Sequence, residues 1–161
     1  MHFLKGCRSR FFIWSILVSV VALTEGCQTS TQSLFTSSGP GWTVRQGQAL
    51  WRPRQGLPEV AGDLVMVSDG SGRCSLQFDK TPLSLVMAQT TPTRWLIRFP
   101  VRHMGFGGHE PPPTRFAWLQ LPAALAGAPL PSAMRFQTKP DGGWHLENTH
   151  TGESLDGFLS P

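Results

Sequence analysis

The sequence predicts a mainly β fold, an antiparallel meander of about eight strands with a helix lying on a curved sheet. Short apolar segments between residues 60 and 99 are separated by tight turn sequences rich in Asp, Gly, Thr and Pro, as in antiparallel hairpins. Apolar and polar residues alternate within several of these segments, which gives the sheet one buried face. The segment 60–68 is apolar on both faces, because Leu64 and Met66 alternate with valines, so a helix or an enclosed cavity must cover its second face.

The start of the chain has the features of a secretory signal. Residues 1–10 carry three basic residues and no acid, and residues 11–23 are an uncharged apolar run. That run is shorter than the roughly 20 apolar residues of a membrane-spanning helix. Leu23-Thr24-Glu25-Gly26-Cys27 then resembles the lipobox of bacterial lipoproteins, which predicts cleavage before Cys27 and lipid attachment to that cysteine. Glu25 departs from the lipobox pattern, so an ordinary signal peptide or an uncleaved anchor is the alternative.

The residues after the lipobox are predicted to form a flexible tether. Residues 28–41 are rich in Ser, Thr, Gly and Gln and contain only two large apolar residues. The predicted division is therefore a signal peptide at 1–26, a tether at 27–41 and a single β-rich domain at 42–161. Gln28 stands where an Asp retains lipoproteins in the inner membrane of better-known systems. By that resemblance, the protein is expected on the outer membrane, facing the periplasm.

The β-rich domain contains two groups of predicted strands with a connecting region between them. In this connection, His103 to Pro113 is rich in Gly and Pro and is predicted to be a loop. Pro122 then starts, and Gly127 ends, a short predicted helix at residues 122–126. The predicted strands are 60–68, 73–78, 83–89, 94–99, 133–138, 144–149 and 153–159.

Three motifs in this domain resemble the outer-membrane lipoprotein receptor LolB and the LolA/LolB-like family. Residues 118–129, Trp-Leu-Gln-Leu-Pro-Ala-Ala-Leu-Ala-Gly-Ala-Pro, are similar to the family segment in which a Leu-Pro pair opens a helix that closes in Gly-x-Pro. Residues 61–66 and 74–78 resemble its first two strands, so the similarity extends from Val60 to Leu146 in outline. The resemblance implies a half-open antiparallel barrel covered by one or two short helices. Its apolar cavity would accept the acyl chains of lipoproteins delivered by a periplasmic carrier.

The resemblance also implies which residues would contact lipid. Apolar residues of the predicted strands and helix are expected to line the acyl-binding cavity. These are Leu64, Met66, Leu76, Phe78, Trp95, Ile97, Trp118 and Leu125. Leu83, next to a hairpin turn, is the candidate for a membrane contact by its position, but a core residue at the start of a strand is the favoured interpretation.

Two clusters of polar residues have side chains that could carry chemistry. The sequence has no G-x-S-x-G, phosphate-loop or dinucleotide-binding pattern, so we expect no enzyme, no catalytic residues and no cofactor. His103, His109 and Glu110 would supply three zinc ligands, yet one glycine-rich loop rarely positions three ligands, and solvated side chains are the favoured interpretation. His145 and Glu147 share a strand face, where cross-strand polar pairing is favoured over an acid–base pair.

Charge and cysteine content narrow the choice of partners. The formal charge is +4, of which the three basic residues and one acid of the leader account for +2, and the remaining Lys and Arg are scattered. Nucleic acid is therefore not an expected partner.

Cys74 is the only cysteine after Cys27, which excludes a disulfide within the domain. It is expected to be a buried hydrophobic residue on a strand.

Two functions from different classes fit these features. The first is a lipid-anchored cell-envelope protein that binds lipid or lipoprotein acyl chains and acts in lipoprotein localisation to the outer membrane. The alternative is a structural or assembly lipoprotein that binds a protein partner through a sheet edge or the 103–113 loop. Metal-dependent hydrolysis at His103, His109 and Glu110 ranks last.

Overall fold

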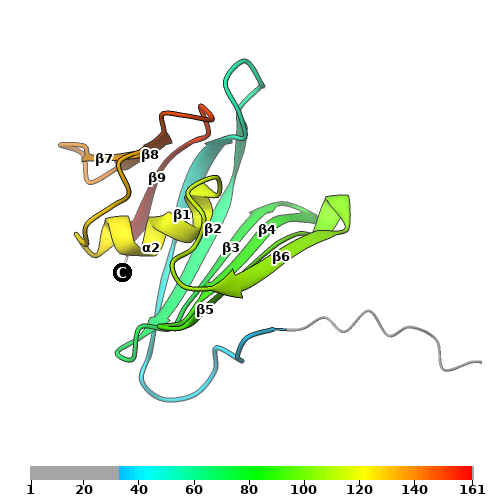
Figure 1. Cartoon of the computed structure of the whole chain (residues 1–161), viewed down its shortest axis with the longest axis vertical. Helices are drawn as coiled ribbons and strands as arrows, with labels where there is room; N and C mark the ends of the chain where they lie inside the picture. Colours follow the sequence, from blue (N-terminus) through cyan, green and yellow to red (C-terminus); the bar gives the residue numbers. More distant parts are fainter. Residues whose placement is uncertain (1–32, 161) are drawn as a thin grey trace, which may run out of the picture. The chain divides into compact units, whose positions relative to one another are not determined.

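Nine strands pair into one antiparallel sheet in the computed structural model, which describes residues 33–160 (Figure 1). The strands are β1 (Trp42–Arg52), β2 (Val60–Asp69), β3 (Cys74–Lys80), β4 (Leu83–Thr90), β5 (Arg94–Phe99), β6 (Met104–His109), β7 (Met134–Thr138), β8 (Trp144–Asn148) and β9 (Ser154–Ser160). Their order in the sheet is β6-β5-β4-β3-β2-β1-β9-β8-β7. The first strand pairs with the last, and β6 and β7 form the two edges, so the sheet is not closed.

The predicted antiparallel meander is confirmed in both strand groups, β2 to β5 and β7 to β9. Turn chemistry supplies a local reason for these hairpins. Between β2 and β3, an Asp69 carboxylate oxygen accepts hydrogen bonds from the backbone N–H groups of Ser71 and Arg73, each at 3.0 Å. Between β7 and β8, Gly142 adopts a φ of 81°, which few residues other than glycine tolerate.

The strand β6 corrects the prediction of a loop at residues 103–113. Met104–His109 pair with Arg94–Phe99 of β5 without a break in register. Three of these six residues are glycines, which have a low strand propensity, so pairing with β5 rather than local preference places this segment in the sheet. A short 3-10 helix, η1 (Pro100–Arg102), connects β5 to β6.

The helix α2 (Ala117–Leu125) corrects the predicted helix bounds, because Pro122 lies inside it rather than in its first turn. Residues 117–121 are all buried, so packing onto the sheet stabilises the part of the helix that precedes the proline. Pro122 has no N–H to bond to the Trp118 carbonyl, and the burial of this apolar stretch offsets that loss. Gly127, with a φ of 69°, follows the end of the helix, as the sequence predicts.

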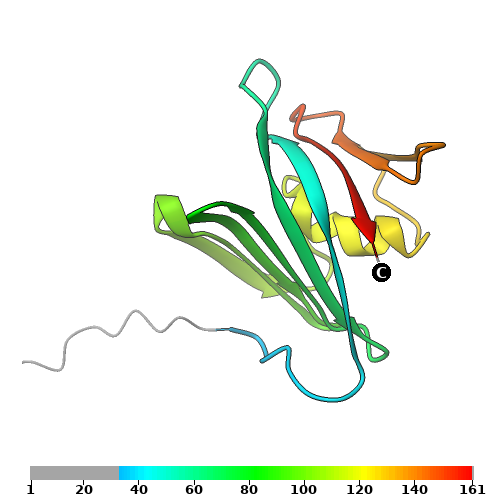
Figure 2. The ribbon, with the colours of Figure 1, turned by 180° about the vertical axis from the view of Figure 1, so that it is seen from behind.

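One face of the sheet, called here the covered face, packs against α2 and holds the hydrophobic core (Figures 1 and 2). The helix contacts β4, β8 and β9 and so bridges the two strand groups. The opposite side is called here the open face, and Val44 and Phe158 are exposed on it. The largest fully buried apolar side chains are Trp118, Phe78, Leu64, Ile97, Leu121, Leu146, Leu155 and Val86.

Glycine on the covered face makes room for two aromatic rings. A Cβ atom at Gly157 would lie 2.6 Å from the Gln48 carbonyl oxygen and 2.8 Å from the Trp144 ring. One at Gly62 would lie 2.8 Å from the Phe78 ring. Carbon atoms in contact normally stay about 3.5 to 4 Å apart, so a larger residue at either position would displace its neighbours.

Residues 33–41, called here the arm, belong to the predicted tether and contact the sheet. Gln89, on the open face of β4, accepts a hydrogen bond from the Leu34 N–H at 2.8 Å and donates one to the Phe35 carbonyl at 3.2 Å. Phe35 stacks on Trp42 with 5.4 Å between ring centroids. These contacts tie the arm to the domain. The predicted signal peptide and Cys27 lie outside the described residues.

Candidate functional site

The eight residues predicted to line an acyl cavity all lie on the covered face or on α2. Seven of them are buried in the hydrophobic core, and Leu125 packs against it. The ring centroids of Phe78 and Trp118 are 4.9 Å apart, and those of Trp51 and Trp118 are 5.9 Å apart. The structure therefore packs these residues against one another, and only Met66 among the eight borders the open space beside α2.

That space is a cleft of about 780 Å³ along α2, called here the α2 cleft. It lies where β2 turns into β3 and β4 turns into β5. Small-molecule sites typically measure about 300 to 1,000 Å³, so the volume suits a ligand. The apolar residues that line it are Met66, Cys74, Pro92, Pro111, Pro112, Leu119, Pro122, Ala123, Ala126, Pro129 and Pro131.

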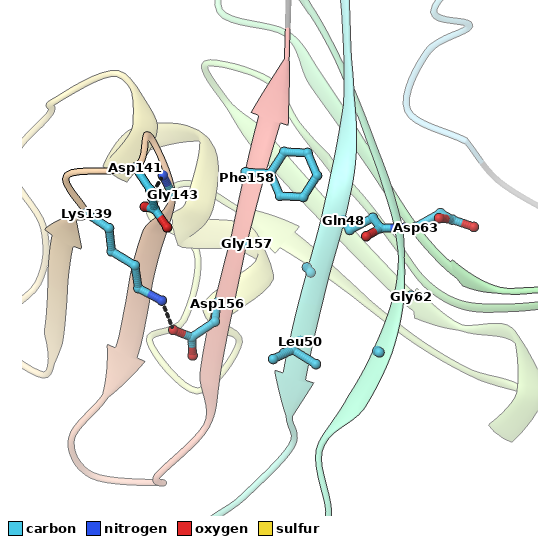
Figure 3. Close-up of a pocket in the computed structure, with 12 residues that line it drawn as sticks. Gln48, Leu50, Gly62, Asp63, Lys139, Asp141, Gly143, Asp156, Gly157 and Phe158 are labelled. Atoms are coloured by element: carbon cyan, nitrogen blue, oxygen red, sulfur yellow. Dashed lines mark hydrogen bonds and ion pairs between the residues drawn. The ribbon is translucent and has the colours of Figure 1, made fainter.

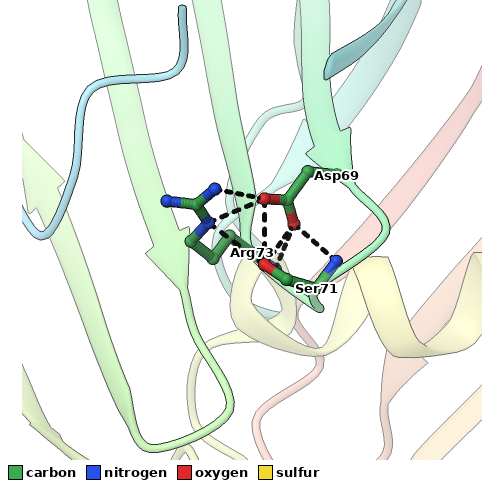
Figure 4. A network of polar contacts seen from close by, with 3 residues as sticks. All are labelled: Asp69, Ser71 and Arg73. Atoms are coloured by element: carbon green, nitrogen blue, oxygen red, sulfur yellow. Dashed lines mark hydrogen bonds and ion pairs between the residues drawn. The ribbon is translucent and has the colours of Figure 1, made fainter. Parts of the chain in front are cut away.

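The rim of the α2 cleft carries a charged pair in the β2–β3 turn (Figure 4). The Asp69 carboxylate accepts hydrogen bonds from the Ser71 hydroxyl at 2.8 Å and from Nε of Arg73 at 2.7 Å. Burial by itself would raise the pKa of Asp69, but these hydrogen bonds outweigh it and lower the pKa to about 2. The guanidinium of Arg73 also lies 4.9 Å from the Trp42 ring, so it links the cleft rim to the start of β1.

A buried carboxylate holds α2 against the sheet. Glu153, only 5% exposed, accepts a hydrogen bond from the Ala117 N–H at 2.8 Å and another from the Trp51 indole N–H at 3.0 Å. Burial is the dominant influence and raises the pKa of Glu153 to about 7, although both hydrogen bonds favour the ionised form. The group that positions this wall of the cleft therefore titrates near neutral pH.

A second hollow of about 520 Å³ lies on the open face across β1, β2 and β9 (Figure 3). At its side, the Lys139 ammonium donates a hydrogen bond to Asp156 at 2.9 Å, and Asp156 also pairs with Nδ1 of His145 at 2.9 Å. Burial would raise the pKa of Asp156, but the hydrogen bonds from Lys139 and His145 lower it. The hollow is lined by three aspartates, Asp63, Asp141 and Asp156, and one lysine, so the more apolar α2 cleft is the better candidate for binding an apolar ligand.

Leu83, the candidate membrane contact, is 51% exposed, so the favoured interpretation as a core residue is wrong. Val101 in η1 is also 51% exposed, and Met104 at the start of β6 is 42% exposed. We call these three residues the apolar end. It lies at the start of β4, whereas Thr90 at the end of β4 lines the α2 cleft. Within residues 33–160, no helix is long and apolar enough to cross a membrane.

The structure also bears on the other candidate sites. His103 immediately precedes β6 and His109 ends it, so the two residues are roughly 20 Å apart along the strand. No three His, Cys, Asp or Glu side chains among the described residues are grouped to hold a metal. His145 pairs with Asp156 across β8 and β9, as the cross-strand interpretation predicts. Cys74 is buried, as predicted, and burial raises the pKa of its thiol to about 12, so it is not a nucleophile.

Comparison with known proteins found no matching protein-family model and no curated protein with a matching sequence. Function must therefore be inferred from the geometry of the site. The sequence located Met66 beside the cleft but did not point to Arg73 or Glu153. The turn sequence around Arg73 carried a signal for a tight hairpin, whereas nothing local to Glu153 indicates that α2 buries it.

Proposed function

We propose that this protein is a lipid-anchored cell-envelope protein that binds an acyl chain in the α2 cleft. The observation that carries the proposal is the apolar lining formed by Pro122 and Ala123 of α2, by Ala126 just after the helix, and by Met66 of β2. Taking an acyl chain out of water stabilises the complex by about 0.8 kcal/mol for each buried methylene, and an apolar hollow is the surface that provides this gain.

The arrangement of sheet and helix supports a half-open barrel of the LolA/LolB kind. The sheet does not close between β6 and β7, and α2 lies on its covered face. In such a barrel, the buried residues Phe78 and Trp118 form the surface that an acyl chain would reach if α2 moved outward. Met66 belongs to the same set and already lines the α2 cleft.

The arm supports a position close to a membrane. Lipid on Cys27 would be joined to Ser33, where the arm begins, by a link of at most roughly 20 Å. The domain would then lie near the outer membrane, on its periplasmic side. We propose that acyl chains of lipoproteins enter it from a periplasmic carrier protein during lipoprotein localisation.

The apolar end supports a direct contact with the bilayer. Leu83, Val101 and Met104 expose apolar side chains, and Lys80 and Arg102 stand beside them in sequence. Apolar side chains that insert between lipids, together with cations that meet anionic headgroups, are the two contributions that hold a protein on a membrane surface. Leu83 is thus the proposed membrane contact.

The acyl-binding proposal is tested by filling the cleft. We expect Ala123→Trp to weaken binding of a fluorescent long-chain fatty acid at least about tenfold, because excluding two methylenes is enough for that loss. Ala128→Trp, an exposed position outside the lining, is the matched control. Both variants are made in the full chain with Cys27→Ser, so that the chain's own lipid cannot occupy the cleft. Equal binding by the two variants, or no binding by the parent protein, would refute the proposal.

The membrane contact is tested separately. We expect Leu83→Glu to reduce binding to vesicles that contain anionic phospholipid several-fold, because a carboxylate opposes both insertion and headgroup attraction. Val44→Glu changes a residue of similar exposure, 49%, on the open face and should retain binding. If Val44→Glu reduces sedimentation with vesicles as much as Leu83→Glu does, the apolar end is not the contact.

A further inference from the structure

The outer side of β6 is a free sheet edge. Among the described residues β6 pairs only with β5. The Glu110 N–H donates to the Thr93 carbonyl at 3.0 Å, which fixes the alternation of hydrogen bonds along the pair. By that alternation, Gly105, Gly107 and His109 direct their backbone N–H and C=O groups away from β5. The His109 carbonyl accepts a hydrogen bond from the Trp95 indole. The backbone N–H and C=O groups of Gly105 and Gly107 lie at the free edge of the sheet.

This edge lacks the usual protection against pairing with another chain. Edge strands are normally blocked by proline, lysine or a bulge, and none of these interrupts Met104–His109. Gly105 and Gly107 are exposed, and neither has a positive φ that would require glycine. A Cβ at Gly105 would lie 3.5 Å from the Arg98 side chain, an ordinary contact, so the fold itself has room for a larger residue there.

A groove of about 670 Å³ accompanies the edge. Gly105 to His109 form one side of it, and Pro111, Pro113 and Arg115 of the connection to α2 also line it. The Arg115 guanidinium lies 5.2 Å from the Phe106 ring. A strand added beside β6 would direct alternate side chains toward this groove, which is how strand addition combines backbone affinity with side-chain selectivity.

The charge of this region indicates what kind of strand would bind. Residues 94–116 contain four arginines, two histidines and a single acid, Glu110. An acidic segment is attracted to such a surface, whereas a second copy of this chain pairing edge to edge would bring the arginines of both copies together. Charge therefore favours a different, acidic partner over self-association.

We infer that the free edge of β6 binds an extended acidic segment of another protein by strand addition, with one of its acidic side chains at Arg115. This interaction is separate from acyl binding, because the edge groove and the α2 cleft share only one lining residue, Pro111. The two proposals can therefore fail independently.

The test uses the full chain in detergent and a short synthetic peptide that alternates threonine and glutamate. We expect the peptide to slow hydrogen exchange at the Gly105 and Gly107 amides. Gly107→Pro removes an N–H group that points to the free edge, so it should weaken peptide binding about tenfold or more. Thr138→Pro is the matched control, because the Lys139 N–H bonds to Gly143 and the Thr138 N–H therefore faces the free edge of β7.

Charge selectivity is measured with Arg115→Ala and with a peptide in which lysine replaces glutamate. Both changes should weaken peptide binding several-fold. The unfolding transition of Arg115→Ala should be the same as that of the parent protein, which shows that the variant is still folded. Equal binding of the lysine peptide, protection at β7 instead of β6, or self-association that Gly107→Pro abolishes would each overturn the inference. Protection of the two glycine amides by anionic vesicles but not by the peptide would overturn it as well.

Discussion

Large apolar side chains are buried on the covered face of the sheet and exposed on the open face. On the covered face, Trp118 and Phe78 are fully buried against each other, whereas on the open face Phe158 is 48% exposed. Both faces carry large apolar residues, but α2 packs on only one of them. Apolar composition alone therefore does not decide which face is the core. The position of α2 decides it, and the same helix forms a wall of the cleft.

The largest expected effect is the loss of an aromatic side chain under α2. Trp118→Ala should lower the free energy of unfolding by about 3 to 5 kcal/mol, because it removes buried area and leaves a cavity. Phe158→Ala on the open face should cost less than about 1 kcal/mol. Denaturant unfolding of both variants measures the contrast. Similar losses would show that the open face contributes to the core as much as the covered face.

The next effect concerns the carboxylate that holds α2 on the covered face. The pKa of Glu153 rises from about 4.5 to about 7 on folding, so the folded protein favours the protonated form. Its stabilising contribution is complete below about pH 4.5 and is lost as the pH rises to about 7, by about 3 kcal/mol. Unfolding free energies measured across this range should show that fall. Glu153→Gln should flatten it, and an unchanged slope would assign the titration to another group.

Replacing glycine by alanine should have a smaller effect on stability, and the effect should differ between the two faces of the sheet. Gly157→Ala places a methyl group against the Trp144 ring and should destabilise the protein by about 1 to 3 kcal/mol. Gly105→Ala, on the open face of β6, should be neutral or stabilise by up to about 1 kcal/mol, because alanine restricts the unfolded chain. Thermal unfolding compares the two. Destabilisation by Gly105→Ala would mean that the fold, rather than a partner, requires glycine at the edge.

The smallest expected effect is on the open face, where the arm is attached. Gln89→Ala removes both hydrogen bonds to Leu34 and Phe35 and should speed exchange of the Leu34 amide, with a stability loss of about 1 kcal/mol. Gln77→Ala, on the same face of β3, is the control because Gln77 bonds to Asp79 and not to the arm. Equal protection of the Leu34 amide in both variants would show that the contacts of the Phe35 ring with Trp42 and Arg73 hold the arm without Gln89.

The hairpins could be predicted because their signals are local. The turn residues between β2 and β5 and the alternation of Cys74, Leu76 and Phe78 stand next to one another in the chain, and the strands follow them. The strand β6 could not be predicted, since its glycines disfavour strands and only the adjacent β5 holds it in place. Of the residues predicted to line a cavity, only Met66 lines the cleft, because the position of the cleft depends on where α2 lies.

By itself, the sequence determined the mainly β class, most strand positions and the burial of residues such as Leu64 and Cys74. The tertiary structure decided that β1 pairs with β9, that α2 begins before Pro122 and that Glu153 is buried beneath the helix start. The physical reason is the distance along the sequence over which each interaction acts. Turn chemistry and alternation act over a few neighbouring residues, whereas burial and strand pairing join residues that are distant in the chain.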